Sequence, residues 1–201
     1  MSATNKQKKV GYDRSTDQTT TTPWLPPQWL TDAVQPVDLD PSALEGQMPW
    51  STARVMLTPK EDGPTTVWRA QDFVFYNPRG GARMPGCMAK SAKHGHGFTL
   101  SYARTDTQYF FDSVFRHPNA TALFFFEGRL KFCHLDGTPG GSAGAPSVLI
   151  AYGPEARRRL VEAVRAKKLF GRIILLGADQ TEVWQLGRRP SKKAKATRRA
   201  A

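Results

Sequence analysis

Residues 72–81 read Asp-Phe-Val-Phe-Tyr-Asn-Pro-Arg-Gly-Gly, and this segment decides the fold. Its first half is a continuous apolar run, which is typical of a strand buried on both faces of a parallel sheet. Its second half is rich in Gly and Pro, so we expect the strand to end at Tyr76 and a loop to begin at Asn77. Taken alone, Asn77-Pro78 has the composition of an ordinary turn after a strand.

Helix-like and strand-like segments alternate on both sides of this run. Helical spacing and start signals predict helices over residues 26–34, 105–117 and 154–168, the second capped by Thr105 or Asp106. The stretch 42–70 is expected to be irregular. Short apolar runs predict further strands at residues 37–41, 98–102, 123–126, 147–152, 173–176 and 183–186.

This alternation predicts an α/β fold, a single Rossmann-like domain whose mostly parallel sheet is flanked by helices. In such a sheet, ligands bind beyond the carboxyl ends of the strands. Asp38, Asp40 and Asn77 are all expected at such ends, so chemistry is expected there. A solvated turn is the simpler explanation for the two acids.

The charge of the chain is strongly basic, +12 over 201 residues. An excess of this size favours polyanions, usually nucleic acid, as partners. The sequence predicts a disordered segment at 1–21, a domain over 22–187 and a disordered basic tail at 188–201. The seven Lys and Arg residues of that tail either solubilise the chain or hold phosphates without regard to sequence.

The sequence predicts a cytoplasmic protein without a membrane segment or a metal site. No apolar run approaches the ~20 residues that a membrane helix needs, and no apolar signal core follows Met1. Cys87 and Cys133 are the two cysteines, too few for a disulfide framework or a zinc knuckle. His94-Gly95-His96 lacks two further ligands, so a turn that ends a helix is the preferred interpretation.

Several short segments occur in one particular order along residues 22–153. They are Thr22-Pro23-Trp24-Leu25, Val37-Asp38-Leu39-Asp40-Pro41, Asp62-Gly63 followed by Trp68, Asn77-Pro78, Ala103-Arg104-Thr105-Asp106-Thr107 with Phe110, Gly128-Arg129-Leu130-Lys131-Phe132 and Gly144-Ala145-Pro146-Ser147-Val148. Each is weak alone. In this order they resemble the phage DNA N-6-adenine methyltransferase family, which is Dam-like.

The resemblance implies a methyltransferase domain that uses S-adenosylmethionine and acts on double-stranded DNA in a host cytoplasm. Asn77 and Pro78 would be catalytic. An adenine N6 amine is a poor nucleophile because its lone pair is delocalised into the ring. Two carbonyl oxygens that accept its protons would favour a tetrahedral nitrogen, and the base must first be flipped out of the duplex. The resemblance assigns cofactor binding to Thr22, Pro23, Asp38, Asp40 and Pro41, and we expect Arg79, Arg104, Thr105, Arg129 and Lys131 to contact DNA.

The chain departs from the family after Pro78. Where the family has Pro-Tyr, this chain has Arg79-Gly80, so the loop lacks the ring that stacks on the base. Base–aromatic stacking is worth about 1–3 kcal/mol. Two further hypotheses therefore stand beside methyl transfer: a catalytically inactive DNA-binding protein with this fold, and a DNA base modifier with an altered substrate. For Arg104 and Arg129, a helix cap and a solvated hairpin face are the simpler alternatives.

Overall fold

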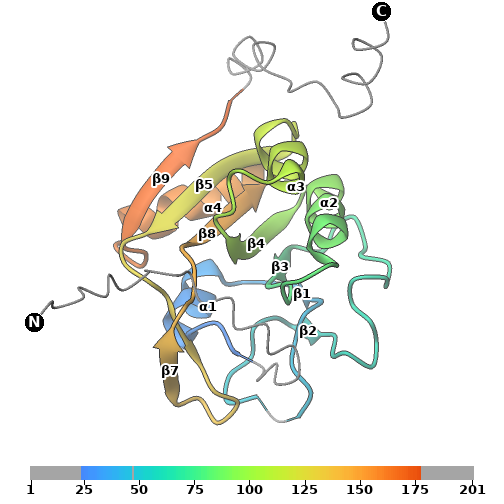
Figure 1. Cartoon of the computed structure of the whole chain (residues 1–201), viewed down its shortest axis with the longest axis vertical. Coiled ribbons are helices and arrows are strands. Elements are labelled where there is room, and N and C mark those ends of the chain that lie inside the picture. Colours follow the sequence, from blue (N-terminus) through green and yellow to red (C-terminus); the bar gives the residue numbers. More distant parts are fainter. Residues whose placement is uncertain (1–23, 47, 178–201) are drawn as a thin grey trace, which may run out of the picture.

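Seven strands in the described residues form one sheet (Figure 1). The computed structural model describes residues 24–46 and 48–177. Across the sheet the strand order is β2-β1-β3-β4-β8-β5-β9. Their bounds are β1 Leu39–Asp40, β2 Val55–Met56, β3 Val74–Tyr76, β4 Gly97–Tyr102, β5 Ala120–Phe126, β8 Ser147–Tyr152 and β9 Gly171–Leu175.

The sheet is mixed, and the expectation of a mostly parallel sheet holds for one half only. Strands β2, β1, β3 and β4 pair in parallel. Strand β8 is antiparallel to both β4 and β5, and β9 is antiparallel to β5. The physical reason lies in the connection from β5 to β8, which contains a hairpin and no helix. Antiparallel neighbours tolerate such a connection, whereas parallel neighbours need a long crossover.

Helices cover both faces of the sheet, and the core has two corresponding halves. Helices α1 (Gln28–Val34) and α4 (Pro154–Arg165) pack on one face, and α2 (Met84–His94), α3 (Gln108–Phe110) and the π-helical turn η1 (Phe111–Phe115) on the other (Figure 1). Strand β8 shows why, since neighbouring side chains of a strand point to opposite faces. Leu149 and Ala151 belong to the α1/α4 half, and Val148 and Ile150 to the α2 half.

Two predicted segments need correction. The helix expected over residues 105–117 is a short α3 followed by η1, and it begins after Thr107 rather than after Thr105 or Asp106. The Thr107 hydroxyl donates to the Arg104 carbonyl at 2.7 Å, so it closes the loop instead of capping the helix. Within the stretch expected to be irregular, β2 adds a two-residue edge strand.

The turn predicted at His94-Gly95 is confirmed. Helix α2 ends at His94, and Gly95 follows with a φ of 71°, a left-handed conformation that glycine adopts readily. The strand predicted at 183–186, the segments 1–21 and 188–201, and the two residues Thr22 and Pro23 lie outside the described residues.

A small second sheet forms an arm beside the main one. It pairs β6 (Lys131–Cys133) with β7 (Pro139–Ser142). Leu25 and Cys133 exchange two backbone hydrogen bonds of 2.8 Å, so the chain that leads into α1 is attached to this arm. The attachment places Leu25, near the start of the described chain, beside the arm that lies between β5 and β8 in the sequence.

Candidate active site

The carboxyl ends of β1 and β3 meet where the sheet changes direction. From β1 the chain continues outward to β2, and it then returns past β1 to add β3 and β4 on the other side. The two segments that leave β1 and β3 therefore diverge at a topological switch point, the usual ligand-binding place in an open α/β sheet. Pro41-Ser42 leaves β1 there, and Asn77-Pro78 leaves β3.

A partly buried chain of hydrogen bonds joins these two segments. The Asn77 backbone N–H donates to Ser42 Oγ at 3.0 Å. Ser42 Oγ in turn donates to Asp40 Oδ1 at 2.7 Å, and the Ser42 N–H donates to the same oxygen at 2.8 Å. Thr52 Oγ1 donates to Asp40 Oδ2. Asp40 thus fixes the start of the Asn77 loop through Ser42.

The Asp40 carboxyl is enclosed by protein, with 3% of its residue surface exposed. Burial raises the pKa of this carboxyl above its ordinary value, and the hydrogen bonds from Ser42 and Thr52 act in the opposite direction. Its oxygens accept from Ser42 and Thr52, and Asp40 lines neither of the two cavities described below. The hydrogen bonds of Asp40 therefore indicate that it positions Ser42.

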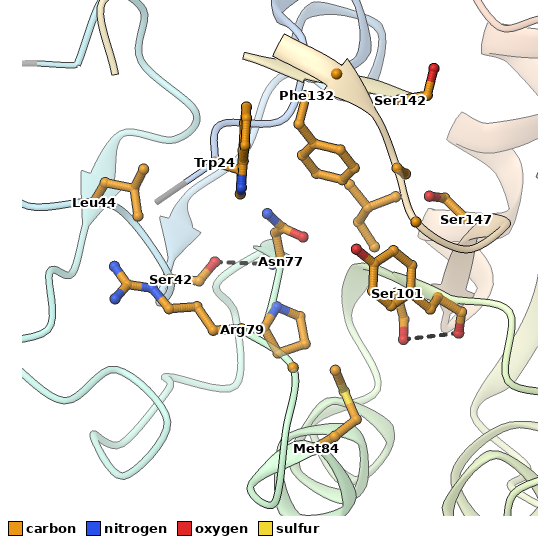
Figure 2. A pocket seen from close by; sticks show the side chains of 17 residues that line it. Trp24, Ser42, Leu44, Asn77, Arg79, Met84, Ser101, Phe132, Ser142 and Ser147 are labelled. Carbon is orange, nitrogen blue, oxygen red and sulfur yellow. Dashed lines mark hydrogen bonds between the residues drawn. The ribbon is translucent and has the colours of Figure 1, made fainter. Parts of the chain in front are cut away.

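A cavity of about 470 Å³ opens above the Asn77 loop, within the about 300–1,000 Å³ that is usual for small-molecule sites. Asn77 lies between the rings of Trp24 and Phe132 in Figure 2. Pro78 and Arg79 continue the wall. The other lining residues are Ser42, Leu44, Gly80, Met84, Leu100, Ser101, Tyr102, Gly141, Ser142, Ala143, Gly144 and Ser147.

Trp24 is held at the cavity by the β6–β7 arm. The backbone exchange between Leu25 and Cys133 fixes the neighbouring residue, and the Trp24 ring lies 4.7 Å from the His134 ring, centroid to centroid. The indole also covers Gly140 so closely that a Cβ there would lie 2.1 Å from its Cζ3 atom. With 40% of its surface exposed, Trp24 offers an aromatic wall that a ligand can still reach.

A second cavity of about 210 Å³ lies beside the first and shares Ser42, Arg79 and Gly80 with it. The carboxylate that lines this cavity belongs to half-buried Asp62, whose Oδ1 atom lies 3.7 Å from Nη1 of Arg83. The remaining wall consists of Pro41, Ala43, Leu57, Thr58, Pro59, Gly63, Pro64, Tyr76 and Cys87.

Lys90 holds part of the wall of the second cavity in place. Its ammonium donates to the carbonyls of Pro64, at 2.6 Å, and of Thr66, and lies 4.5 Å from the centre of the Trp68 ring. Burial lowers the pKa of Lys90, while Asp62 and Cys87 act against that change. Three carbonyls and one ring thus hold the loop that carries Asp62.

The structure brings part of the predicted site together. Asn77, Pro78 and Arg79 line the main cavity, and Pro41 lines the second. Asp38 lines neither. Its carboxylate accepts from the Phe73 N–H at 2.9 Å and lies 3.6 Å from the Arg54 guanidinium.

The predicted DNA-binding residues lie on exposed segments around the cavity. Arg104 and Thr105 are exposed on the loop that follows β4, the strand whose end lines the cavity. Arg129 and Lys131 are exposed at the base of the arm, and Arg129 Nη1 donates to the carbonyl of Ala143, a lining residue, at 3.3 Å.

Sequence reasoning assigned no role to Trp24, Ser42, Phe132 or Ser147, all of which line the main cavity. A signal existed for three of them, because Trp24, Phe132 and Ser147 belong to the segments that carry the family resemblance. Asp62 belongs to them as well. Asp62 lines the second cavity, and Trp24 reaches the main one through the attachment of Leu25 to the arm, which no local pattern reveals.

Across residues 24–46 and 48–177, no three His, Cys, Asp or Glu side chains form a group that could hold a metal ion. His94 instead has its Nε2 atom 2.9 Å from the Asp72 carbonyl. None of the helices in this part of the chain is both long enough and apolar enough to cross a membrane.

Comparisons of the chain with protein-family models, with curated proteins and with solved structures gave no match.

Proposed function

We propose that the protein transfers a methyl group from S-adenosylmethionine to the N6 amine of adenine in DNA. One observation carries the proposal. The Asn77-Pro78 loop leaves β3 at the switch point of the sheet, is tied by its backbone to Ser42, and opens into a cavity with two aromatic walls. A rigid pair of carbonyl acceptors in an aromatic slot suits a planar base that carries an amine.

The proposed roles follow from the chemistry of that amine. The Asn77 side-chain carbonyl and the Pro78 backbone carbonyl accept its two protons, which directs the nitrogen lone pair toward the methyl donor. A base reaches such a cavity only after it has been flipped out of the duplex. Trp24 or Phe132 supplies the stacking surface that Arg79-Gly80 does not.

S-adenosylmethionine supplies an electrophilic methyl group on a sulfonium when it is bound. Asp38 and Asp40 fit this cofactor poorly, because their carboxylates are engaged by protein groups and line neither cavity. The second cavity offers more suitable groups, but its volume of about 210 Å³ is below the about 300–1,000 Å³ usual for small-molecule sites, so it would hold only part of the cofactor. Asp62 there offers an acceptor for an ammonium or for hydroxyls, and Pro41 and Ser42 join that cavity to the Asn77 loop.

The exposed cations around the cavity suit a DNA duplex. Arg104, Arg129 and Lys131 are exposed, and in this proposal they contact phosphates on either side of the flipped base. Phosphate contacts of this kind set register and affinity but carry no base sequence information.

The deciding experiment is mass spectrometry of the nucleosides from DNA of cells that express the protein, in parallel with transfer of labelled methyl groups in vitro. We expect N6-methyladenine with the wild type and none with Asn77→Ala. The variant should retain its affinity for DNA and its melting temperature, because the interaction it removes strengthens mainly in the transition state. A different modified nucleoside would instead identify a base modifier with an altered substrate.

A DNA-binding protein that has lost catalysis is the second candidate. The observation in its favour is that both acids predicted to hold the cofactor serve the protein's own structure. In that case the same cells would contain unmodified DNA, S-adenosylmethionine would not raise the melting temperature, and DNA binding would persist.

A further inference from the structure

One buried hydroxyl at the wall of the main cavity has no hydrogen-bond partner among the described residues. Ser147 is the first residue of β8 and lies opposite Tyr102 of β4 in the antiparallel register. Only 5% of its surface is exposed, and its Oγ atom makes no hydrogen bond with the described residues. In Figure 2 it lies across the cavity from Asn77.

The other serines of the cavity differ from Ser147 in this respect. Ser42 Oγ is bonded to Asp40 and to the Asn77 N–H. Ser101 Oγ donates to the Tyr102 carbonyl at 3.2 Å. Ser142 is exposed at the rim, where water can serve it.

The remaining unpartnered hydroxyls of the described residues have a simpler explanation. Ser91 and Thr99 both line a void of about 10 Å³, the size that takes a single water molecule. Ser147 borders the cavity of about 470 Å³ instead. A buried hydroxyl normally finds a hydrogen-bond partner, so a ligand group in this cavity is the expected partner of Ser147.

We propose that Ser147 reads the ring edge of the base, donating a hydrogen bond to a ring nitrogen next to the amine that Asn77 holds. This inference rests on the proposed function. In adenine, N1 and N7 flank the exocyclic amine, and both are acceptors that a serine hydroxyl can satisfy. Ser147 is then a specificity residue. It requires an acceptor beside the amine, while Asn77 and Pro78 require the amine itself.

The test measures binding of 2′-deoxyadenosine and of its 1-deaza and 7-deaza analogues to the full chain by calorimetry or saturation-transfer NMR. We expect Ser147→Ala to bind 2′-deoxyadenosine about 2- to 12-fold more weakly, the range for one neutral hydrogen bond. The wild type should lose a similar factor with one of the two deaza analogues. Ser147→Ala should not distinguish that analogue from the natural nucleoside.

Two controls separate recognition from a structural role. Ser51→Ala makes the same change at an exposed serine that lines neither cavity and should leave binding unchanged. The melting temperature of Ser147→Ala should equal or exceed that of the wild type, because an unpartnered buried hydroxyl is replaced by an apolar group. A lower melting temperature together with equal losses for all three nucleosides would overturn the assignment.

The inference and the proposed function can fail separately. Unchanged binding of 2′-deoxyadenosine by Ser147→Ala, or no binding by the wild type, overturns the role of Ser147 even if DNA is methylated. Ser147-dependent binding without methyl transfer to DNA keeps the role and removes the catalytic proposal.

Discussion

The Asn77 N–H donates a hydrogen bond of 3.0 Å to Ser42 Oγ, and this bond joins two loops that lie 35 residues apart in the sequence. It fixes the backbone at the first residue of the loop, so the Asn77 side chain departs from a defined point. The bond depends in turn on Asp40, which accepts from both the hydroxyl and the N–H of Ser42. A buried carboxylate that touches no cavity can therefore control a loop that does.

We expect Ser42→Ala to lower both the stability of the protein and its methylation rate. The change leaves the Asn77 N–H without its acceptor and removes one donor from the buried Asp40 carboxylate. Because this hydrogen bond is only partly buried, the free energy of unfolding should fall by about 0.5–1.5 kcal/mol, the net contribution of one ordinary hydrogen bond. Chemical denaturation measures the fall.

Ser51→Ala is the matched control for this change. Ser51 is an exposed serine whose hydroxyl donates to the Ala53 carbonyl at 2.7 Å, away from both cavities. Its replacement should change the free energy of unfolding by about 0.5 kcal/mol or less and leave the rate unaltered. Equal effects of the two substitutions would contradict the role given to Ser42.

The raised pKa of Asp40 predicts a definite pH dependence. The folded protein holds this proton more tightly than the unfolded chain does, because burial disfavours the charged carboxylate. The carboxyl's contribution to stability is therefore complete below its ordinary pKa of 3.8 and is lost as the pH rises through the raised value. Relative to Asp40→Asn, the wild type should lose stability as the pH rises from about 4.

Denaturant unfolding of the two proteins at several pH values tests this prediction. The informative quantity is the difference between their free energies of unfolding, since the other titrating groups are common to both. A difference that is flat with pH, or that grows in favour of the wild type at higher pH, would show that the hydrogen bonds from Ser42 and Thr52 outweigh burial.

The sequence predicts the strand that leads to Asn77 much better than it predicts the residues that surround the cavity. The run that ends at Tyr76 is unmistakably a buried strand, because every residue of β3 is apolar or aromatic and is buried. Gly95 marks the end of α2 for an equally local reason. Such features depend on a few neighbouring residues, and a pattern in the sequence contains them.

The positions of the residues around the cavity depend on pairings between distant segments of the chain. Nothing local places β8 between β4 and β5, and the prediction of a mostly parallel sheet was wrong for that half. The acids of the predicted strand 37–41 were expected to face a cofactor, yet the Asp40 carboxylate accepts hydrogen bonds from Ser42 and Thr52 instead. Trp24 reaches the cavity only because Leu25 pairs with Cys133.

Gly140 and Gly141 offer a test of the Trp24 wall. A Cβ at position 140 would lie 2.1 Å from Trp24 Cζ3 and 2.8 Å from the Phe132 backbone oxygen, so Gly140→Ala must displace the indole, the backbone of β6 or both. A Cβ at position 141 meets nothing within 4 Å, and Gly141 also lines the main cavity. If Trp24 stacks on the base, Gly140→Ala should weaken base capture and Gly141→Ala should not.

The methylation rate at low DNA concentration measures this effect, and tryptophan fluorescence reports the movement of the indole. Loss of a full stacking contact is worth about 1–3 kcal/mol, which corresponds to a fall in rate of about 5- to 150-fold. A displaced indole with an unaltered rate would mean that another ring of the cavity, Phe132 or Tyr102, supplies the stacking surface.

The last prediction concerns the loop residue that replaces the family's aromatic. Gly80 has room for a side chain, since a Cβ there meets nothing within 4 Å and its φ is not in the left-handed region. Gly81, with a φ of 94°, would be strained by any side chain, and Gly81→Tyr therefore serves as the control. If Trp24 has taken over the stacking role, Arg79→Pro with Gly80→Tyr should change the wild-type rate little but should restore most of the rate that Trp24→Ala loses.

The measurement compares four proteins: the wild type, Trp24→Ala, Arg79→Pro with Gly80→Tyr, and the chain with all three changes. Their methylation rates on one DNA substrate give the coupling between Trp24 and the loop directly. Effects that simply add would mean that Trp24 and the ring at position 80 act on different parts of the substrate. A fall in rate on introducing the family's Pro-Tyr into the otherwise unchanged chain would indicate instead that Arg79 itself contacts the substrate in the cavity it lines.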